Sequence, residues 1–166
     1  IIINGGTTTY QMVHFLTSKR VSVFTNSFAI AEFLIHNSRN PVVIPGGTVY
    51  REQNVILSPF GGVVASHFYA KRMFIGCQGI GAHGLMEADP MVVQSELGLI
   101  GQADELIVLA DSSKFSGRSS LILCGLDRIA AVITDSGIRD EDRQMLETAG
   151  VKLIVADTTA QAAAVA

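Results

Sequence analysis

The chain has 166 residues, enough for one ordinary domain with a sizeable hydrophobic core. Hydrophobic residues make up 48% of it, charged residues make up 16%, and the formal net charge of −3 argues against nucleic-acid binding by this chain alone. No apolar run approaches the ~18 residues that a membrane span needs, and no basic segment leads into an apolar one as in a secretory signal. We therefore expect a single cytoplasmic domain with no membrane contact.

Neither the cysteines nor the histidines form a pattern typical of metal binding or thiol chemistry. Cys77 and Cys124 are far apart and belong to no CxxC motif, which suits reduced thiols and favours small buried side chains over a catalytic nucleophile. The four histidines share no HxH or HxxxH spacing. We expect no metal site and no cofactor.

Strand and helix patterns alternate along the chain. Short apolar runs, often β-branched, predict strands at residues 1–3, 21–24, 41–44, 73–75, 106–110, 129–134 and 152–155, with 54–57 extended. Apolar residues at helical spacing, or helix caps, predict helices from residue 10 and over residues 28–35, 61–70, 90–102 and 140–149. Repeated strand–helix units with continuous apolar strands are typical of an α/β fold: an open, mostly parallel, Rossmann-like sheet with helices on both faces.

The chain shows no internal linker and no repeat. We expect one domain over residues 1–159, followed by an alanine-rich tail at residues 160–166 that has no apolar face to bury. The first residue is not methionine, and the sequence begins within a predicted strand, so we expect the chain to be part of a longer protein.

The most informative motif is the turn directly after the first strand, Asn4-Gly5-Gly6-Thr7-Thr8-Thr9. The glycines allow a tight turn, and the threonine hydroxyls lie beside the free N–H groups that begin a helix. Such a helix N-terminus presents backbone donors to an anion. The turn lacks the GxxxxGK[ST] spacing of a nucleotide P-loop and the GxGxxG of a dinucleotide fold. We interpret it as a phosphate cradle, with a plain strand-to-helix connection as the alternative.

Small polar residues also follow the other predicted strands, and in open parallel sheets ligands bind outside the carboxyl ends of strands. The clusters are Thr25-Asn26-Ser27, Gly46-Gly47, Ser58, the glycine-rich loop at residues 76–84, Asp111-Ser112-Ser113-Lys114 and Thr134-Asp135. Helix capping explains each cluster taken separately. It explains Asp-Ser-Ser-Lys less well, because a lysine after two hydroxyls supplies a point charge for phosphate or carboxylate.

Five motifs, taken in order, resemble the C-terminal sensor domain of DeoR-type repressors of sugar catabolism. They are Ile3-Asn4-Gly5-Gly6-Thr7-Thr8, Thr25-Asn26, Pro45-Gly46-Gly47, Gly76-Cys77-Gln78-Gly79-Ile80 and Asp111-Ser112-Ser113-Lys114-Phe115. The resemblance covers nearly the whole chain. It implies a fold like that of ribose-phosphate isomerase and glucosamine-phosphate deaminase, with a phosphorylated sugar or sugar acid as effector. It also implies a winged helix-turn-helix, outside this chain, that binds operator DNA. We expect a homo-oligomer.

The same resemblance assigns roles within the site. Gly6, Thr7 and Thr8 would hold the phosphate, and Asn26, Gly79 and Lys114 would surround the sugar. Together with the polar clusters, this gives the expected ligand-binding residues: Gly5, Gly6, Thr7, Thr8, Thr9, Thr25, Asn26, Ser27, Gly46, Gly47, Gly79, Asp111 and Lys114. We assign no catalytic residue.

Two features depart from the family pattern. Many members carry a Lys or Arg pair on the helix after the glycine-rich loop, where residues 89–96 of this chain supply acids but no base. One cationic contact is therefore absent or comes from elsewhere. Asn4 stands where many members have Asp. An uncharged amide repels a sugar acid less than a carboxylate does, which hints at an acidic or oxidised sugar phosphate.

A sugar-phosphate isomerase or deaminase on the same fold is the alternative function. An isomerase of this kind needs a positioned base beside the carbonyl carbon of the sugar. In the ribose-phosphate isomerase family an Asp-Gly-Ala-Asp-Glu run fills that role. The comparable loop here, residues 76–84, is followed by its first carboxylate only at Glu87. The sequence therefore favours a sensor over an enzyme.

Overall fold

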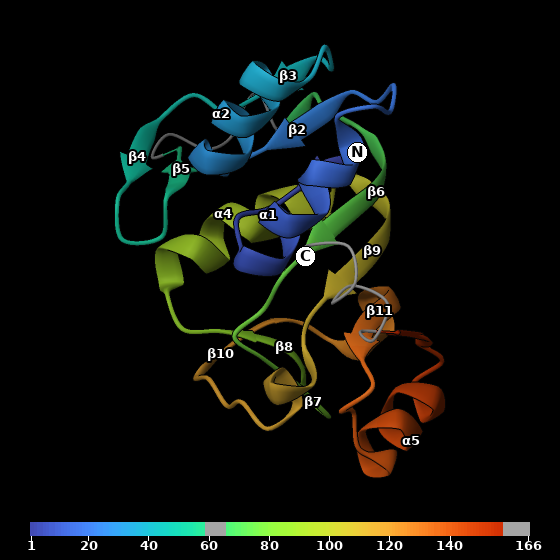
Figure 1. The fold of residues 1–166 in the computed structure, drawn as a ribbon. Coiled ribbons are helices and arrows are strands. Elements are labelled where there is room, and N and C mark those ends of the chain that lie inside the picture. The colour runs from blue at the N-terminus through green and yellow to red at the C-terminus, as the bar shows by residue number, and fades with distance from the viewer. Residues whose placement is uncertain (59–65, 158–166) are drawn as a thin grey trace.

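The computed structural model describes residues 1–58 and 66–157, whose fold is drawn in Figure 1. Seven parallel strands form the central sheet of the described residues: β1 (Ile2–Ile3), β2 (Val23–Thr25), β3 (Val42–Val43), β6 (Ala70–Ile75), β9 (Ala103–Leu109), β11 (Ile129–Asp135) and β12 (Lys152–Ala156). Their order across the sheet is β12-β11-β9-β6-β1-β2-β3. The chain runs from β1 to one edge, returns to β6 beside β1, and then runs to the other edge. This is a doubly wound α/β sheet, which confirms the predicted fold class.

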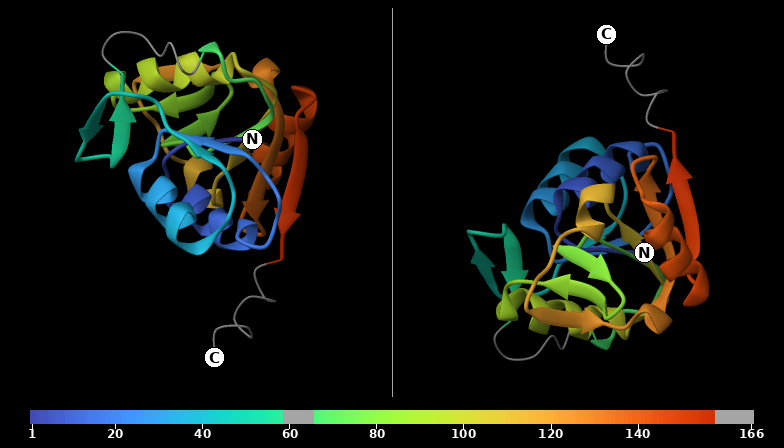
Figure 2. Two further views of the ribbon diagram at one scale, coloured as in Figure 1. Left: turned by 90° about the horizontal axis from the view of Figure 1, so that it is seen from above. Right: turned by 90° about the horizontal axis from the view of Figure 1, so that it is seen from below.

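Helices cover both faces of the sheet. They are α1 (Thr7–Val13), α2 (Phe28–Asn37), α4 (Pro90–Ile100) and α5 (Asp140–Thr148). Because successive strand residues point to opposite faces, Ile3 packs with Val13 of α1 and Ile30 of α2, whereas Ile2 belongs to the core that contains Leu99 of α4. The views in Figure 2 show α1 and α2, in blue, on one side of the strands and α4, in yellow-green, on the other.

Two small antiparallel sheets flank the main one. The hairpin of β4 (Thr48–Tyr50) and β5 (Val55–Leu57) forms one, and β7 (Gly79–Gly81), β8 (Gly84–Glu87) and β10 (Leu121–Cys124) form the other. The segment at residues 76–84, predicted as a loop, is therefore largely a β-hairpin, and that prediction is wrong. Gly79 sits in it where a Cβ atom would lie 2.7 Å from the carbonyl oxygen of Gly117. Only glycine fits there because two chain segments pack closely. Since glycine has a low strand propensity, the sequence gives no signal for this strand.

Several element boundaries differ from the predictions. The first helix begins at Thr7 rather than residue 10, because Gly6 is already its N-cap. α4 begins with Pro90 at its first turn, as expected, and Gly150 follows α5 with a φ of 74°. Residues 61–65 of the predicted helix at 61–70 lie outside the described residues, and Ala70 begins β6 instead. The predicted tail at residues 160–166 also lies outside them.

The short 3-10 helices are η1 (His14–Leu16), η2 (Ser112–Phe115) and η3 (Leu126–Arg128). Among the helices of the described residues, none is both long enough and apolar enough to cross a membrane.

Candidate functional site

A cavity of about 500 Å³ opens beyond the carboxyl ends of β1 and β6. These two strands are neighbours, but the chain leaves them toward opposite edges of the sheet. In an open α/β sheet such a switch point leaves a crevice outside the strand ends where ligands bind. The polar lining comes from the turn after β1, α1, the N-cap of α2, the β4–β5 hairpin, the segment after β6, β8, α4 and η2. Its residues are 4–8, Tyr10, Gln11, Ser27, 52–54, 76–78, Glu87, Glu96 and Lys114.

The turn at residues 5–8 forms one wall of the cavity, which we call the turn wall. Gly5 approaches the hairpin so closely that a Cβ atom would lie 2.7 Å from Cγ1 of Val55. Thr7 and Thr8 are exposed, and within the described residues no protein group pairs with their hydroxyls. The N–H groups of the first helical turn have no acceptor within the helix. The turn wall therefore presents uncharged donors to the cavity.

Other residues expected to bind ligand are buried and hold the turn in shape. Thr9 donates its hydroxyl hydrogen bond to the carbonyl of Asn4 at 2.9 Å and lies 3.0 Å from that of Gly6. The side-chain oxygen of Asn26 accepts from the N–H of Gly5 at 3.2 Å, and Thr25 accepts from the N–H of Ser27 at 3.0 Å. Thr9, Thr25 and Asn26 do not line the cavity, whereas Ser27 lines it and caps α2.

Four further residues of the expected set lie outside the cavity lining. Gly47 leads into β4, where a Cβ atom would lie 2.0 Å from the carbonyl oxygen of Leu57, and Gly46 precedes it. Gly79 packs against Gly117 as described above. Asp111 caps η2 by accepting from the N–H of Ser113 at 2.9 Å, and this helix carries Lys114 to the cavity. Of the thirteen expected residues, the cavity brings together Gly5, Gly6, Thr7, Thr8, Ser27 and Lys114.

Two carboxyl groups form a second wall of the cavity, the carboxyl wall, consisting of Glu87 and Glu96. Both residues are buried, and Glu96 is only 3% exposed. Burial raises the pKa of Glu96 to about 8; the hydrogen bond from Asn4 opposes this shift, and the negative charge of Glu87 adds to it. Sequence reasoning did not assign either carboxyl to the site. The sequence pattern that could have revealed Glu96 is its position four residues from both Val92 and Ile100, which places it on the same face of α4 as these two buried apolar residues.

Asn4 connects the two walls. Its amide nitrogen donates to Oε1 of Glu96, and its side-chain oxygen accepts from the N–H of Gly76 at 3.0 Å. Asn4 is 2% exposed, so both hydrogen bonds are shielded from water. Because the amide is held from both ends, the turn after β1, the start of the segment after β6 and α4 are fixed relative to one another.

Cys77 also lines the cavity but is not prepared for thiol chemistry. Burial raises the pKa of its thiol to about 12, although the positive charge of Lys114 opposes the shift. Burial likewise raises the pKa of Cys124 to about 11. The thiolate is the nucleophilic form, so both cysteines behave as small apolar side chains near neutral pH. In residues 1–58 and 66–157 no cluster of three or more His, Cys, Asp or Glu residues could hold a metal ion.

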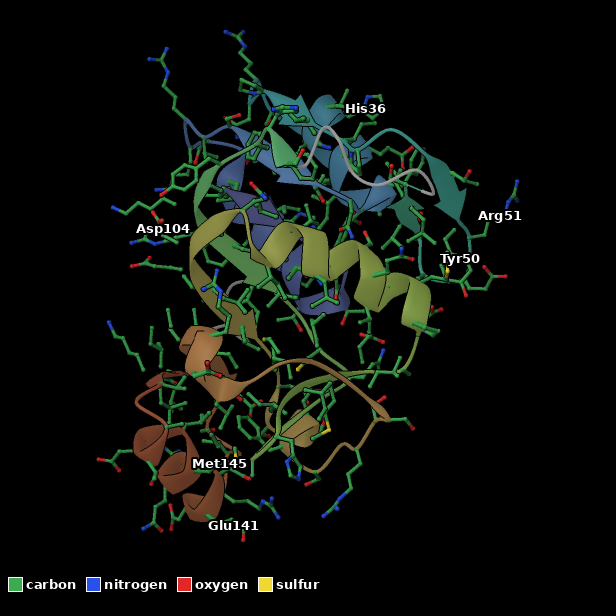
Figure 3. All side chains as sticks on the ribbon, turned by 180° about the vertical axis from the view of Figure 1, so that it is seen from behind. His36, Tyr50, Arg51, Asp104, Glu141 and Met145 are labelled. Atoms are coloured by element: carbon green, nitrogen blue, oxygen red, sulfur yellow. The ribbon has the colours of Figure 1, made fainter. Side chains whose placement is uncertain are left out.

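The β4–β5 hairpin closes the cavity from the side. Its turn contributes residues 52–55 to the lining. The hydroxyl of Tyr50 donates to the carboxylate of Asp89 at 2.8 Å, and Asp89 is the N-cap of α4. Figure 3 shows Tyr50 and Arg51 on this hairpin beside that end of α4. The hairpin is thereby tied to the helix that carries Glu96.

Comparison with known proteins agrees with this architecture. The family model described as "DeoR C terminal sensor domain" matches residues 1–136. The HTH-type transcriptional regulator UlaR of Shigella dysenteriae serotype 1 (strain Sd197) is 31% identical over 157 residues, which cover 93% of this chain and 61% of the regulator. Regulators of the same name from Escherichia coli O1:K1 / APEC and Escherichia coli strain K12 / DH10B match with the same identity and coverage.

The chain thus spans about 61% of the length of these curated relatives. The family is described as a sensor domain, and the relatives are named as transcriptional regulators and not as enzymes. The match covers both the turn wall and the carboxyl wall. The chain belongs to the DeoR C-terminal sensor domain family.

Proposed function

We propose that this chain is the effector-binding domain of a DeoR-type transcriptional regulator of sugar catabolism and that its cavity binds a phosphorylated sugar or sugar acid. The observation that carries the proposal is the cavity at the β1–β6 switch point, where unpaired donors of the turn wall and the cation of Lys114 line one space. Its volume of about 500 Å³ lies within the roughly 300–1,000 Å³ of small-molecule pockets.

The phosphate binds at the turn wall in this proposal. The N–H groups of Gly6, Thr7 and Thr8 and the two threonine hydroxyls donate to the phosphate oxygens, and Lys114 neutralises part of the ligand's charge. Buried Thr9 and Asn26 act indirectly, by keeping the turn in its binding geometry, and buried Thr25 holds the backbone at Ser27. The sugar then extends toward the carboxyl wall.

The effect on transcription requires the part of the protein that lies outside this chain. A winged helix-turn-helix there binds operator DNA, and effector binding changes that affinity through a coupling free energy between the two sites. We place the regulator in the cytoplasm, as a homo-oligomer. The net charge of −3 supports leaving operator recognition to the other module.

Matched pairs of phosphorylated and unphosphorylated sugars test the proposal. At a hundredfold excess over its dissociation constant, a ligand of the folded state adds ~2.7 kcal/mol of stability. We expect such a rise in the melting temperature for at least one compound among ribose 5-phosphate, fructose 6-phosphate, glucose 6-phosphate and 6-phosphogluconate, and little change with the unphosphorylated partner. Equal effects of the two partners, or none for any pair, would contradict the proposal.

A further inference from the structure

The buried carboxyl of Glu96 has no role in the phosphate cradle, and its surroundings are unusual for an acid. It lies on the buried face of α4, four residues after Val92 and four before Ile100, which are both buried. It nevertheless lines the same cavity as Lys114 and the turn wall. Buried carboxyl groups are rare unless they are paired. Glu96 forms no salt bridge within the described residues.

The hydrogen bonds around Glu96 satisfy only one of its two oxygens. The N–H of Gly76 donates to the side-chain oxygen of Asn4, and this fixes the amide so that its nitrogen faces Oε1 of Glu96. No protein group of the described residues donates to Oε2. In the same residues, the buried side-chain atoms without a partner comprise Thr134 Oγ1 alone. Oε2 is therefore not sealed in the core, and the space open to it is the cavity.

The charged and titratable groups around Glu96 come from four other segments. Glu87 of β8 is negative, Cys77 follows β6, and Cys124 belongs to β10. Asp111, the N-cap of η2, lies outside the cavity lining, whereas Lys114 of η2 lines it; the charges of both act on Cys77. Burial raises the pKa of Glu96 to about 8, and the charge of Glu87 adds to this shift, because both disfavour a negative charge on Glu96. At pH 7 the group is mainly a neutral acid, whose O–H is a donor.

We propose that Glu96 binds the ligand as a neutral carboxylic acid, with Oε2–H donating a hydrogen bond to an oxygen of the sugar part. This inference rests on the proposed function, and it defines the ligand more narrowly. The ligand carries phosphate at the turn wall and presents an acceptor oxygen, such as a carbonyl, carboxylate or hydroxyl oxygen, at the carboxyl wall. A neutral acid donates a hydrogen bond to an anionic oxygen there, whereas an ionised one would repel that oxygen.

Ligand affinity should consequently fall as Glu96 ionises. Between pH 7 and pH 9 the protonated fraction of a group with a pKa of about 8 decreases roughly tenfold. Ionisation of the phosphate contributes little to the change in affinity between pH 7 and pH 9, because its second pKa is near 6. Glu96→Gln replaces the acid O–H by an amide N–H that donates at every pH and keeps an oxygen for Asn4.

Calorimetric titration of ribose 5-phosphate, fructose 6-phosphate, glucose 6-phosphate and 6-phosphogluconate at pH 7 and pH 9 tests this inference. For the compounds that bind, we expect the wild type to bind about tenfold more weakly at pH 9, and Glu96→Gln to bind equally at both. Glu147→Gln, an exposed carboxylate on α5, is the matched control and should retain the wild-type decrease. The same decrease in Glu96→Gln as in the wild type, no decrease in the wild type, or no binding by Glu96→Gln at pH 7 would overturn the role of Glu96.

A second measurement separates this inference from the proposed function. Carbon-13 NMR of the glutamate carboxyl carbons of the free protein should show one group titrating near pH 8 that is absent from Glu96→Gln. Titration of Glu96 in the ordinary range near 4.5 would overturn the inference while leaving the phosphate cradle in place. If none of the four sugar phosphates binds the wild type, the proposed function fails, and the role of Glu96 fails with it.

Discussion

The two walls of the cavity are both polar, but they differ in exposure and in charge. The turn wall is partly exposed and uncharged, and within the described residues the hydroxyls of Thr7 and Thr8 have no protein partner. The carboxyl wall is buried and potentially charged, and its acid Glu96 is held by Asn4. Exposed donors lose water when they take an anion, whereas a buried acid is neutralised by its surroundings before any ligand arrives. In the proposed function, the turn wall anchors the phosphate and the carboxyl wall discriminates among ligands.

The largest predicted effect is the loss of stability on replacing Asn4, whose side chain connects the two walls. Asn4→Leu preserves approximate size but leaves the N–H of Gly76 and Oε1 of Glu96 without partners in a buried site. Each unsatisfied buried group costs about 1–3 kcal/mol, so we expect the free energy of unfolding to fall by roughly 2–6 kcal/mol. Urea denaturation measures it.

A double variant supplies the control for Asn4. In Asn4→Leu with Glu96→Met, the orphaned carboxyl is gone, so the loss should be smaller than the sum of the two single losses by about 0.5–3 kcal/mol. Strict additivity of the two substitutions would show that Asn4 and Glu96 do not act as a pair.

The carboxyl wall should also make stability depend on pH. The pKa of Glu96 is about 8 in the folded protein and near 4.5 as an ordinary carboxyl, so between these values the folded state holds the extra proton. The contribution of Glu96 is therefore fully present below about pH 4.5 and is lost as the pH rises through 8. We expect the difference in unfolding free energy between Glu96→Gln and wild type to increase over this window. A constant difference from pH 5 to pH 9 would contradict the raised pKa.

Lys114, which also lines the cavity, should matter for binding far more than for folding. Lys114→Ala should weaken the binding of a sugar phosphate by roughly 1.5–3 kcal/mol, the scale of a charge-assisted hydrogen bond. Its ammonium group forms no salt bridge in the described residues, so unliganded stability should change by only about 0.5 kcal/mol. Calorimetry and denaturation measure the two quantities. Arg118→Ala, an exposed cation outside the lining, should leave affinity unchanged; equal losses for both variants would indicate a general charge effect.

The smallest effect concerns the hairpin that encloses both walls. Tyr50→Phe removes the hydrogen bond to Asp89 and should lower the free energy of unfolding only slightly, because both groups remain accessible to water. That hydrogen bond also lowers the pKa of Asp89, so the variant should move it back toward its ordinary value. NMR titration of the Asp89 carboxyl tests this, and an unchanged pKa would mean that the hairpin is not tied to α4 in solution.

The sequence predicted the parallel sheet well because its strands are short apolar runs that follow one another in a regular strand–helix order. It failed for the β7–β8 hairpin, where glycines are kept for close packing and carry no strand signal. It also could not tell which polar residues at a strand end face the cavity. Thr9 and Thr25 are small polar residues near strand ends, the type of residue that often contacts a ligand. Both are buried, however, and their hydroxyls form hydrogen bonds with the backbone.

The sequence contained two clues to the carboxyl wall, but only the structure shows that the residues behind them are in contact. Asn4 in place of the usual Asp, and acids instead of a base on the helix at residues 89–96, were separate departures from the family pattern. The structure shows that Asn4 contacts Glu96, so the two departures belong to one arrangement. A carboxylate at position 4 would face another carboxyl group, whereas the amide donates to it.

Mapping of amide chemical shifts during titration with a sugar phosphate tests whether the cavity at the β1–β6 switch point binds the phosphate. With a compound that raises the melting temperature, we expect the largest changes at the backbone N–H groups of Gly6, Thr7 and Thr8, with further changes at Lys114. An open depression lined by Lys19, Arg20 and Arg39 offers anions an alternative site elsewhere on the surface. Changes concentrated there, with the turn after β1 unaffected, would contradict a phosphosugar site at the β1–β6 switch point.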